Sequence, residues 1–171
     1  MAKIKGEVVF TEIQRFKQIW LWLLIGGMAL VFWAGFFSQV IFGRHFGSNP
    51  ISNLTLTLVT AFMGVVFPYF FYYMRLKTNV RPEGIYVRFY PFHLKNIFIP
   101  IERIATAEAV KYNPILDFGG WGIRWGFGGK AYNVSGNKGV QLVYKDGKRL
   151  LIGSQKHKQF AEIINRLIDQ K

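Results

Sequence analysis

The sequence contains no cysteine, only three histidines and only nine acidic residues in a chain of 171. Without cysteine, the chain has no disulfide framework, no thiolate zinc site and no cysteine nucleophile. His45, His93 and His157 lie far apart and match no metal-ligand spacing, so we interpret each as a solvated or capping residue. We therefore predict no metal site and no cofactor.

The shortage of acidic residues leaves a large positive charge. Lysine and arginine together number 22, which gives a formal net charge of +13. This charge indicates an anionic partner, either lipid head groups or nucleic acid. Hydrophobic residues make up 51% of the chain and aromatic residues 18%, and the apolar residues are concentrated in two long runs. That concentration favours a membrane protein.

Both apolar runs lack charged residues entirely. They occupy residues 19–42 and 54–74, and a helix of either length crosses a hydrocarbon core of about 30 Å. Pro68 should kink the second helix because it frees the carbonyl of Gly64. A cleaved signal peptide is the alternative for the first run, but the run exceeds the usual apolar length and no small-residue cleavage motif follows it.

The two runs predict a transmembrane hairpin over residues 19–74, joined by a polar turn at residues 43–53. Basic residues flank its ends and only Arg44 lies in the turn, so the positive-inside rule places both termini in the cytoplasm and the protein in the cytoplasmic (inner) membrane. The residues expected at the lipid head groups are Arg15, Lys17, Arg75, Lys77 and Arg81. Small residues that would let the two helices approach closely are Gly26, Gly27, Ala34, Thr60, Ala61 and Gly64.

Residues 1–18 precede the hairpin, and a capping box of Thr11 and Gln14 lies within them. In a helix, Phe10 and Ile13 would share one side. We therefore predict a short interfacial helix whose basic residues lie near the head groups. An irregular polar segment is the alternative, because the stretch is short.

Residues 75–171 are long enough for a small cytoplasmic domain. Alternation of apolar and polar residues predicts seven strands, at residues 84–89, 96–100, 105–112, 123–127, 130–134, 140–144 and 149–152. Asp146-Gly147 predicts a type I′ turn between the last two strands. A C-terminal helix follows, with Ser154 as N-cap and an apolar face of Phe160, Ile163, Ile164, Leu167 and Ile168. The fold class is α+β: a helical hairpin, then a seven-stranded antiparallel barrel or sandwich with a C-terminal α-helix.

The stretch GGWGIRWGFGG at residues 119–129 combines six glycines with two tryptophans and one arginine. It does not follow the G-x-G-x-x-G spacing and continues into a strand, so we reject a nucleotide-binding loop and expect the glycines to bend the sheet. An unbulged strand would place Trp121 and Trp125 on one face and Arg124 on the other. We favour a core position for the tryptophans; the alternative is an exposed partner patch of Trp121, Arg124 and Trp125.

The order of these elements resembles the bacterial PH-like (pleckstrin-homology-like) domain membrane proteins, a group of uncharacterised function. The likeness is carried by IPIERI at residues 99–104, YNP at 112–114, GGWGIR at 119–124 and GVQLVYKDGKRLLIGSQ at 139–155. The resemblance implies two nearly orthogonal antiparallel sheets closed at one corner by the helix. PH domains that bind phosphoinositides carry a basic cluster between their first two strands. The matching stretch, residues 87–96, offers only Arg88, His93 and Lys95, so no lipid-binding residue is carried over.

The acidic residues Glu83, Glu102, Glu108 and Asp117 show no spacing suited to acid–base catalysis, and the spans hold no ionisable residue for transport. We therefore predict no catalytic residues. The leading hypothesis is a non-enzymatic, membrane-anchored interaction or scaffold module that binds a protein partner or forms a homo-oligomer, with anionic lipids at its surface. The alternatives are a lipid-binding regulatory protein, an enzyme, or a nucleic-acid-binding protein; we expect no nucleic acid because no such motif is present.

Overall fold

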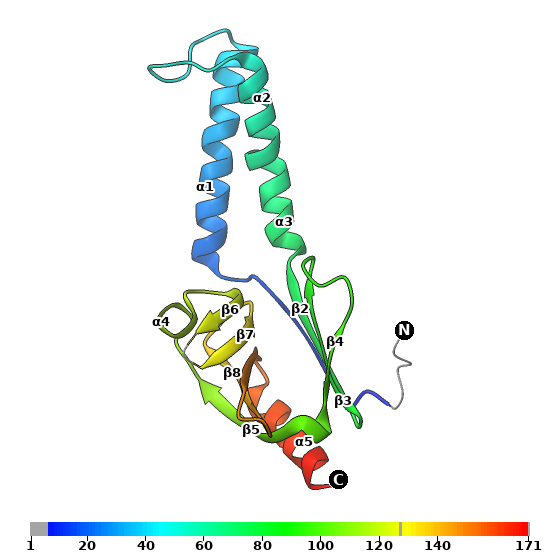
Figure 1. Cartoon of the computed structure of the whole chain (residues 1–171). Helices are drawn as coiled ribbons and strands as arrows, with labels where there is room; N and C mark the ends of the chain where they lie inside the picture. The colour runs from blue at the N-terminus through cyan, green and yellow to red at the C-terminus, as the bar shows by residue number, and fades with distance from the viewer. Residues whose placement is uncertain (1–6, 127, 171) are drawn as a thin grey trace. The chain divides into compact units, whose positions relative to one another are not determined.

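The computed structural model describes residues 7–126 and 128–170, and the chain divides into two compact units (Figure 1). Residues 16–73 form the helical unit. The sheet unit combines residues 1–15 with residues 74–171, so the helical unit is inserted into its sequence. The α+β class is confirmed: two long apolar helices accompany one sheet of four strands and one of five.

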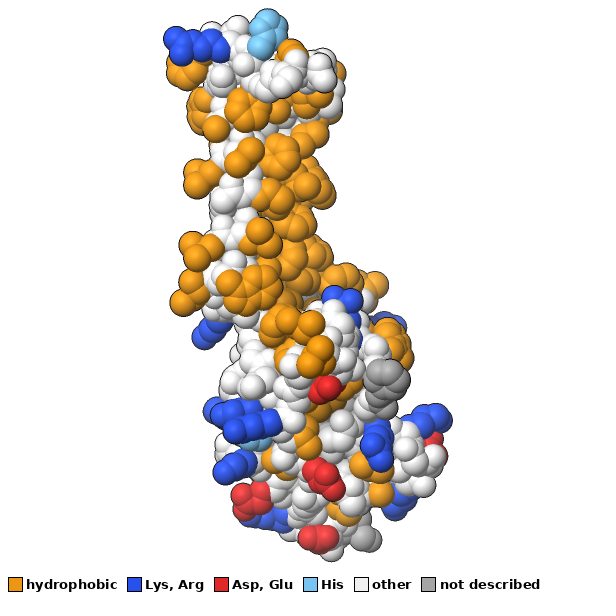
Figure 2. Space-filling view, turned by 90° about the vertical axis from the view of Figure 1, so that its left-hand side faces the viewer, with side chains coloured by type: hydrophobic (Ala, Val, Ile, Leu, Met, Phe, Trp, Pro, Cys, Tyr) orange, Lys and Arg blue, Asp and Glu red, His pale blue; other side chains and the backbone are white. Residues whose placement is uncertain are grey.

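The helical unit consists of two long helices. The first is α1 (Ile19–Phe36) continued by a π-helical turn, η1 (Phe37–Ile41). The second is α2 (Asn53–Ala61), a π-helical turn η2 (Phe62–Val66) and α3 (Phe67–Tyr73). Both are long and apolar enough to cross a membrane, and only 11% of an apolar 18-residue window in each is buried. Figure 2 shows hydrophobic side chains along the surface of this unit.

Three side-chain hydrogen bonds among the described residues join the helices, and one of them, from Gln39 Nε2 to Asn53 Oδ1 at 2.9 Å, lies next to the connecting turn. Thr60 Oγ1 donates to the Phe32 carbonyl at 3.2 Å, and Trp33 Nε1 donates to the Gly64 carbonyl at 3.4 Å. Gly64 lies four residues before Pro68, whose missing N–H leaves that carbonyl without its usual helical donor. The indole of Trp33 therefore takes the place of the lost backbone donor. Gly26 and Gly27, in contrast, have nothing within 4 Å of an added Cβ, so they do not contribute to close helix contact.

Gly64→Val is expected to destabilise the helical unit by about 1–3 kcal/mol, because the added Cβ would lie 2.7 Å from Trp33 Nε1. Circular dichroism during titration of the detergent-solubilised protein with SDS measures the loss. Gly26→Val is the matched control and should leave the midpoint unchanged. Equal effects of the two substitutions would contradict the packing described above.

The sheet unit contains two sheets (Figure 1). The first has the order β1-β2-β3-β4 and consists of β1 (Phe10–Arg15), β2 (Arg75–Arg81), β3 (Gly84–Tyr90) and β4 (Ile97–Pro100). The second has the order β5-β8-β9-β7-β6 and consists of β5 (Ile104–Lys111), β6 (Gly122–Gly126), β7 (Gly129–Asn133), β8 (Lys138–Tyr144) and β9 (Arg149–Gly153). Short helices η3 (Ile101–Arg103) and α4 (Pro114–Phe118) and the C-terminal α5 (His157–Asp169) complete the unit.

The predicted lead-in helix is wrong where it covers Phe10–Arg15, which form β1 and pair with β2. The buried side chains of β1 include Glu12 and Gln14, whose polar groups bind the last residue of β9 and the residues that follow it. Glu12 accepts hydrogen bonds from Ser154 Oγ and from the Gln155 N–H at 2.8 Å, and Gln14 Nε2 donates to the Gly153 carbonyl. The domain predicted over residues 75–171 therefore includes β1. Residues 1–6 of the predicted helix lie outside the described part of the chain.

The C-terminal helix is confirmed, and α5 contacts both sheets. The Phe160 ring stacks on Phe10 of β1 with centroids 4.9 Å apart, and the Asn165 amide binds the N–H and carbonyl of Ala107 on the edge strand β5. Ser154 is not the N-cap, which is Lys156. The Ser154 hydroxyl instead donates to Glu12 and accepts from the Lys156 N–H at 3.1 Å.

All seven predicted strands are present, as β3 to β9, with ends that differ by one or two residues; Phe127 lies outside the described residues. The prediction of an all-antiparallel sheet is wrong, because β7 and β9 are parallel. The β8–β9 hairpin is confirmed, but its turn is not type I′. A type I′ turn needs positive φ at both central residues. Gly147 has φ +81°, but Asp146, like the other described non-glycine residues, does not have positive φ. Tyr144 N–H binds the Lys148 carbonyl, which closes a three-residue loop whose last residue is Gly147.

Candidate functional site: a basic groove lined by aromatic residues

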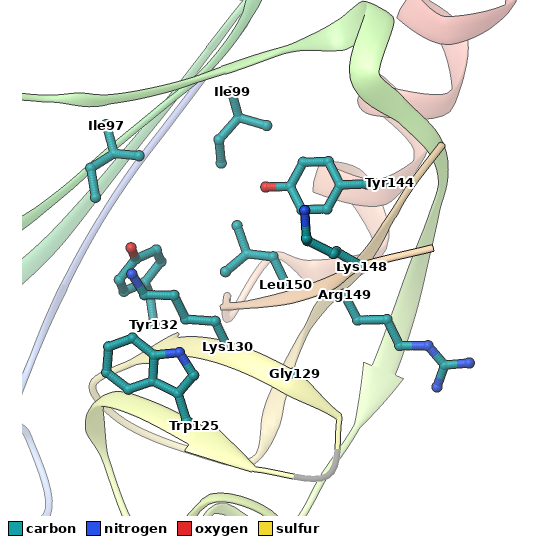
Figure 3. A pocket seen from close by; sticks show the side chains of 10 residues that line it. All are labelled: Ile97, Ile99, Trp125, Gly129, Lys130, Tyr132, Tyr144, Lys148, Arg149 and Leu150. Atoms are coloured by element: carbon teal, nitrogen blue, oxygen red, sulfur yellow. The ribbon is translucent and has the colours of Figure 1, made fainter. Parts of the chain in front are cut away.

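A hollow of about 550 Å³ is lined by β4 and by strands of the five-stranded sheet (Figure 3). Its lining residues are Ile97, Ile99, Trp125, Gly129, Lys130, Tyr132, Tyr144, Lys148, Arg149 and Leu150. A second hollow of about 530 Å³ shares four of these residues and adds Phe98, Pro100, Arg103, Lys145 and Asp146. The two hollows together are called the groove here.

Pairing between strands sets the shape of the groove. The parallel register of β7 and β9 places Lys130 beside Leu150, while β4 contributes Ile97 and Ile99 from the edge of the other sheet. Ile99, Tyr132 and Leu150 are at most 5% exposed and form an apolar floor. Trp125 is 69% exposed at the margin. The groove therefore combines a dry floor with an accessible aromatic wall.

Lys130 lies against the aromatic side chains of the groove. Its Nζ is 4.8 Å from the centroid of the Trp125 ring and 4.9 Å from that of Tyr132. An ammonium held over ring faces is stabilised by the ring quadrupole without losing its charge. Neither ion pair found among the described residues involves Lys130. Its charge is therefore fixed in position and available to an anionic ligand.

Positive charge dominates the groove as a whole. Its lining includes Arg103, Lys130, Lys145, Lys148 and Arg149, against one acidic residue, Asp146. Lys148 Nζ binds Asp146 Oδ2 at 2.8 Å, and this hydrogen bond is the main cause of a lowered pKa for Asp146. The side chain of Arg149 extends away from the floor in Figure 3. An anion entering the groove would thus meet several cations.

Tyr144 supplies a hydroxyl that points into the groove (Figure 3). Burial raises its pKa above the ordinary value of 10.0, and the nearby Tyr132 and Asp146 raise it further while Arg103 lowers it. The phenol is therefore protonated at neutral pH and can donate a hydrogen bond. A carboxylate or phosphate oxygen is the natural acceptor for such a donor.

His93 packs edge-on against Tyr132, with ring centroids 5.3 Å apart, and its Nδ1 accepts the Phe89 N–H at 3.1 Å. Burial lowers the pKa of His93 below 6.5, and the charge of Lys130 lowers it further. The folded state therefore favours the neutral form of His93. Its contribution to the stability of the fold is complete above the unfolded-state pKa and is lost as the pH falls through the folded-state pKa. Protonation also removes the Nδ1 acceptor.

The melting temperature should therefore fall more between pH 7 and pH 5 in the natural protein than in His93→Gln. A glutamine at this position does not titrate, and the rest of the chain is the same in both proteins. Thermal unfolding of the full chain in detergent at the two pH values measures the difference. Equal falls would show that His93 does not contribute to the pH dependence.

The structure separates the predicted partner patch. Trp125 lines the groove, whereas Trp121 lines another hollow and donates from Nε1 to the Gly136 carbonyl at 3.0 Å. Arg124 Nε donates to the Trp121 carbonyl at 3.0 Å. The favoured core position is wrong for Trp125, which is 69% exposed, and Trp121 is half-buried. Since β6 begins at Gly122, Trp121 is outside the strand and the face argument does not apply to it.

The glycine-rich stretch leads from α4 through β6 and into β7, so no helix follows it as a nucleotide-binding loop requires. Gly129 shows why glycine is needed there. Its φ is +94°, and an added Cβ would overlap the backbone carbonyl of Arg149 on β9. The glycine thus permits the close approach of β7 and β9 on which the groove depends.

The predicted head-group residues do not form one cluster. Arg15 and Arg75 are register partners at one end of the four-stranded sheet. Arg81 is at the other end of β2, about 20 Å along the strand, with its guanidinium 5.8 Å from the Tyr86 ring. Because Leu76, Thr78 and Val80 face the core, Arg75, Lys77 and Arg81 share the outer face of this sheet. Lys17 belongs to the helical unit.

Most of the groove was not predicted from the sequence. The available signals were the cluster of basic residues around the β8–β9 turn and the Lys-x-Tyr pattern at Lys130 and Tyr132, but neither indicates which strands are neighbours. Within the described residues, no group of three or more histidine or acidic side chains is placed to hold a metal ion. The groove is thus a binding surface built from cations, aromatic rings and an apolar floor.

Comparison with known proteins gives one result. Residues 1–169 match the family of unknown function DUF6141. The chain belongs to this family. No curated protein and no solved structure was found to match it. Because the matched range includes β1, both long helices and α5, the family is defined by the helical and sheet units together.

Proposed function

We propose that this chain is an integral membrane protein whose two long helices cross the cytoplasmic membrane, with both termini in the cytoplasm. Leu23, Leu30 and Leu54 are each 70% or more exposed, and apolar surface of this extent requires an apolar solvent. Positive charge before the first helix and after the second supports the orientation.

We further propose that the sheet unit is a variant of the PH-like fold. A four-stranded antiparallel sheet, a second sheet and a C-terminal helix in contact with both support this assignment. Residues 87–96, matched above to the loop between the first two strands, form the end of β3 and the β3–β4 connection. The helical unit itself connects β1 to β2. The ligand site of this variant is therefore proposed to lie elsewhere, in the groove.

The proposed function is that of a non-enzymatic interaction module, held at the membrane, that binds an acidic segment of a protein partner in the groove. The observation that carries this proposal is the composition of the groove, with five cations and one acid above an apolar floor. Carboxylates would bind the cations and the Tyr144 hydroxyl, while an apolar side chain of the same segment would cover Ile99 and Leu150. Both kinds of contact suit a peptide better than a simple anion.

Affinity purification of the full chain in mild detergent tests this function. The test compares Lys130→Glu/Arg149→Glu with Lys156→Glu/Lys158→Glu, which makes the same change in charge at exposed positions near the start of α5. A stoichiometric partner that co-purifies with the natural chain and the second variant but not with the first is the expected result. A partner retained by both variants would contradict a role for the groove. A pure homo-oligomer with no other subunit would contradict the binding of a separate partner.

A further inference from the structure

The loop between β3 and β4 is held in a fixed shape by His93. The His93 N–H donates to the Phe89 carbonyl at 2.8 Å, and Nδ1 of its ring accepts the Phe89 N–H at 3.1 Å. Arg88 Nε donates to the His93 carbonyl at 3.1 Å. The His93 side chain is thus directed inward, and its backbone N–H and carbonyl are hydrogen-bonded.

The side chains on both sides of His93 are apolar and exposed. Phe92 is 58% exposed and Leu94 is 85% exposed, and Lys95 beside them is exposed as well. A loop in water normally presents polar side chains and hides apolar ones. This loop instead exposes Phe92 and Leu94 while His93 is half-buried, and the hydrogen bonds of His93 set its shape. Its tip therefore presents an apolar surface next to a cation.

The register of the four-stranded sheet places this loop at a particular end. Arg15, Arg75 and Tyr90 are aligned across β1, β2 and β3. Tyr90 is the last residue of β3, so the loop begins where β1 ends and β2 starts. From this same end, the chain continues from Arg15 to α1 through three residues and returns from α3 to Arg75 through Met74 alone. Both covalent links to the helical unit therefore leave the sheet at the end that carries the loop.

Cations and an aromatic ring surround the same end. The guanidinium groups of Arg75 and Arg88 lie 4.6 and 4.2 Å from the centroid of the Tyr90 ring. Tyrosine and arginine in this combination are typical of the boundary between the acyl chains and the head groups. Basic residues there are attracted to anionic lipids within a Debye length.

We propose that the β3–β4 loop is a second membrane contact of this protein. Phe92 and Leu94 enter the boundary between head groups and acyl chains, while Arg75, Arg88 and Lys95 bind lipid phosphates. This inference rests on the proposed crossing of the membrane by the two helices. The loop then holds the sheet unit against the cytoplasmic leaflet, in addition to the two covalent links.

Spin-label accessibility in the full chain tests the contact directly, since the absence of cysteine allows single labels without background. A nitroxide is attached to Leu94→Cys, Leu30→Cys or Gln159→Cys in nanodiscs that contain phosphatidylglycerol. Relaxation by oxygen, which concentrates in the acyl region, is compared with relaxation by a water-soluble nickel chelate. All three positions are exposed, so the labels should not disturb folding.

The label at Leu94 should show a ratio of oxygen to nickel accessibility several-fold above that at Gln159 and below that at Leu30. If Leu30 is in the acyl region while Leu94 matches Gln159, the loop is in water and the inference is wrong although the helices cross the membrane. If Leu30 itself matches Gln159, the proposed membrane crossing fails and the loop contact fails with it.

Discussion

Phe160→Ala is expected to lower the free energy of unfolding of the sheet unit by about 3–5 kcal/mol, the usual range for a fully buried phenylalanine. The Phe160 side chain is 0% exposed and stacks on Phe10 of β1 with an interplanar angle of 4°. Truncation would leave a cavity where α5 meets β1. The contact between the N-terminal strand and the C-terminal helix would then be lost.

Hydrogen exchange of the full chain in detergent measures this effect. Where exchange in β8 requires global unfolding of the sheet unit, each loss of about 1.4 kcal/mol speeds it tenfold, so an increase of a hundredfold or more is expected. Leu116→Ala is the control, because Leu116 is 77% exposed and its removal should change exchange little. Equal exchange rates in the two variants would contradict the position of α5 against β1.

Gly129→Ala should destabilise the sheet unit and deform the groove at the same time. The positive φ costs an alanine about 1–3 kcal/mol. Overlap of the new Cβ with the Arg149 carbonyl adds about 1–3 kcal/mol and pushes β9 from β7. Partner binding should decrease even where the variant remains folded, since Gly129 and Arg149 both line the groove.

Gly147→Ala separates the strain of a positive φ from the overlap of a new Cβ with a neighbouring strand. Gly147 has φ +81°, but nothing lies within 4 Å of an added Cβ, so only the backbone strain applies. Urea denaturation of both variants should show the larger loss for Gly129→Ala. If Gly147→Ala were equally destabilising, the close approach of β7 to β9 would not be the cause.

The sequence predicted the strands β3 to β9 and the helix α5, because their apolar residues alternate or recur with the period of the structure. It did not predict β1, whose inward face carries Glu12 and Gln14. These polar residues face inward because the end of β9 and the β9–α5 connection supply hydrogen-bond partners for them. A pattern of hydrophobicity cannot show a buried polar contact between segments more than a hundred residues apart.

The sequence of β2, RLKTNVR, shows a different limit. Its basic residues match the positive-inside pattern after an apolar helix. Because that pattern accounted for them, the alternation of Leu76, Thr78 and Val80 was not used to predict a strand. The segment is both a basic flank of the helix and a strand, since its arginines and its lysine occupy the outer face of β2 while the inner face is buried. Charge and strand periodicity are independent signals at this position.

The groove was beyond prediction for a topological reason. It requires β9 to lie between β8 and β7, with β7 parallel to it. Local patterns predict hairpins between consecutive strands, but they do not predict a parallel pairing across β8. Of the three residues of the predicted partner patch, only Trp125 lines the groove, because it is the register partner of Lys130 on β7.

Photo-crosslinking in living cells is the most direct test of partner binding in the groove. A benzophenone amino acid in place of Trp125 lies at the groove margin, and the same group in place of Gln159 on α5 is the control. The account predicts one discrete crosslinked species from position 125, absent from position 159 and lost when Lys130→Glu/Arg149→Glu is added, with the attached peptide rich in acidic residues. Crosslinks from position 125 that persist in this charge-reversed variant, or that attach only to a second copy of this chain, would contradict it.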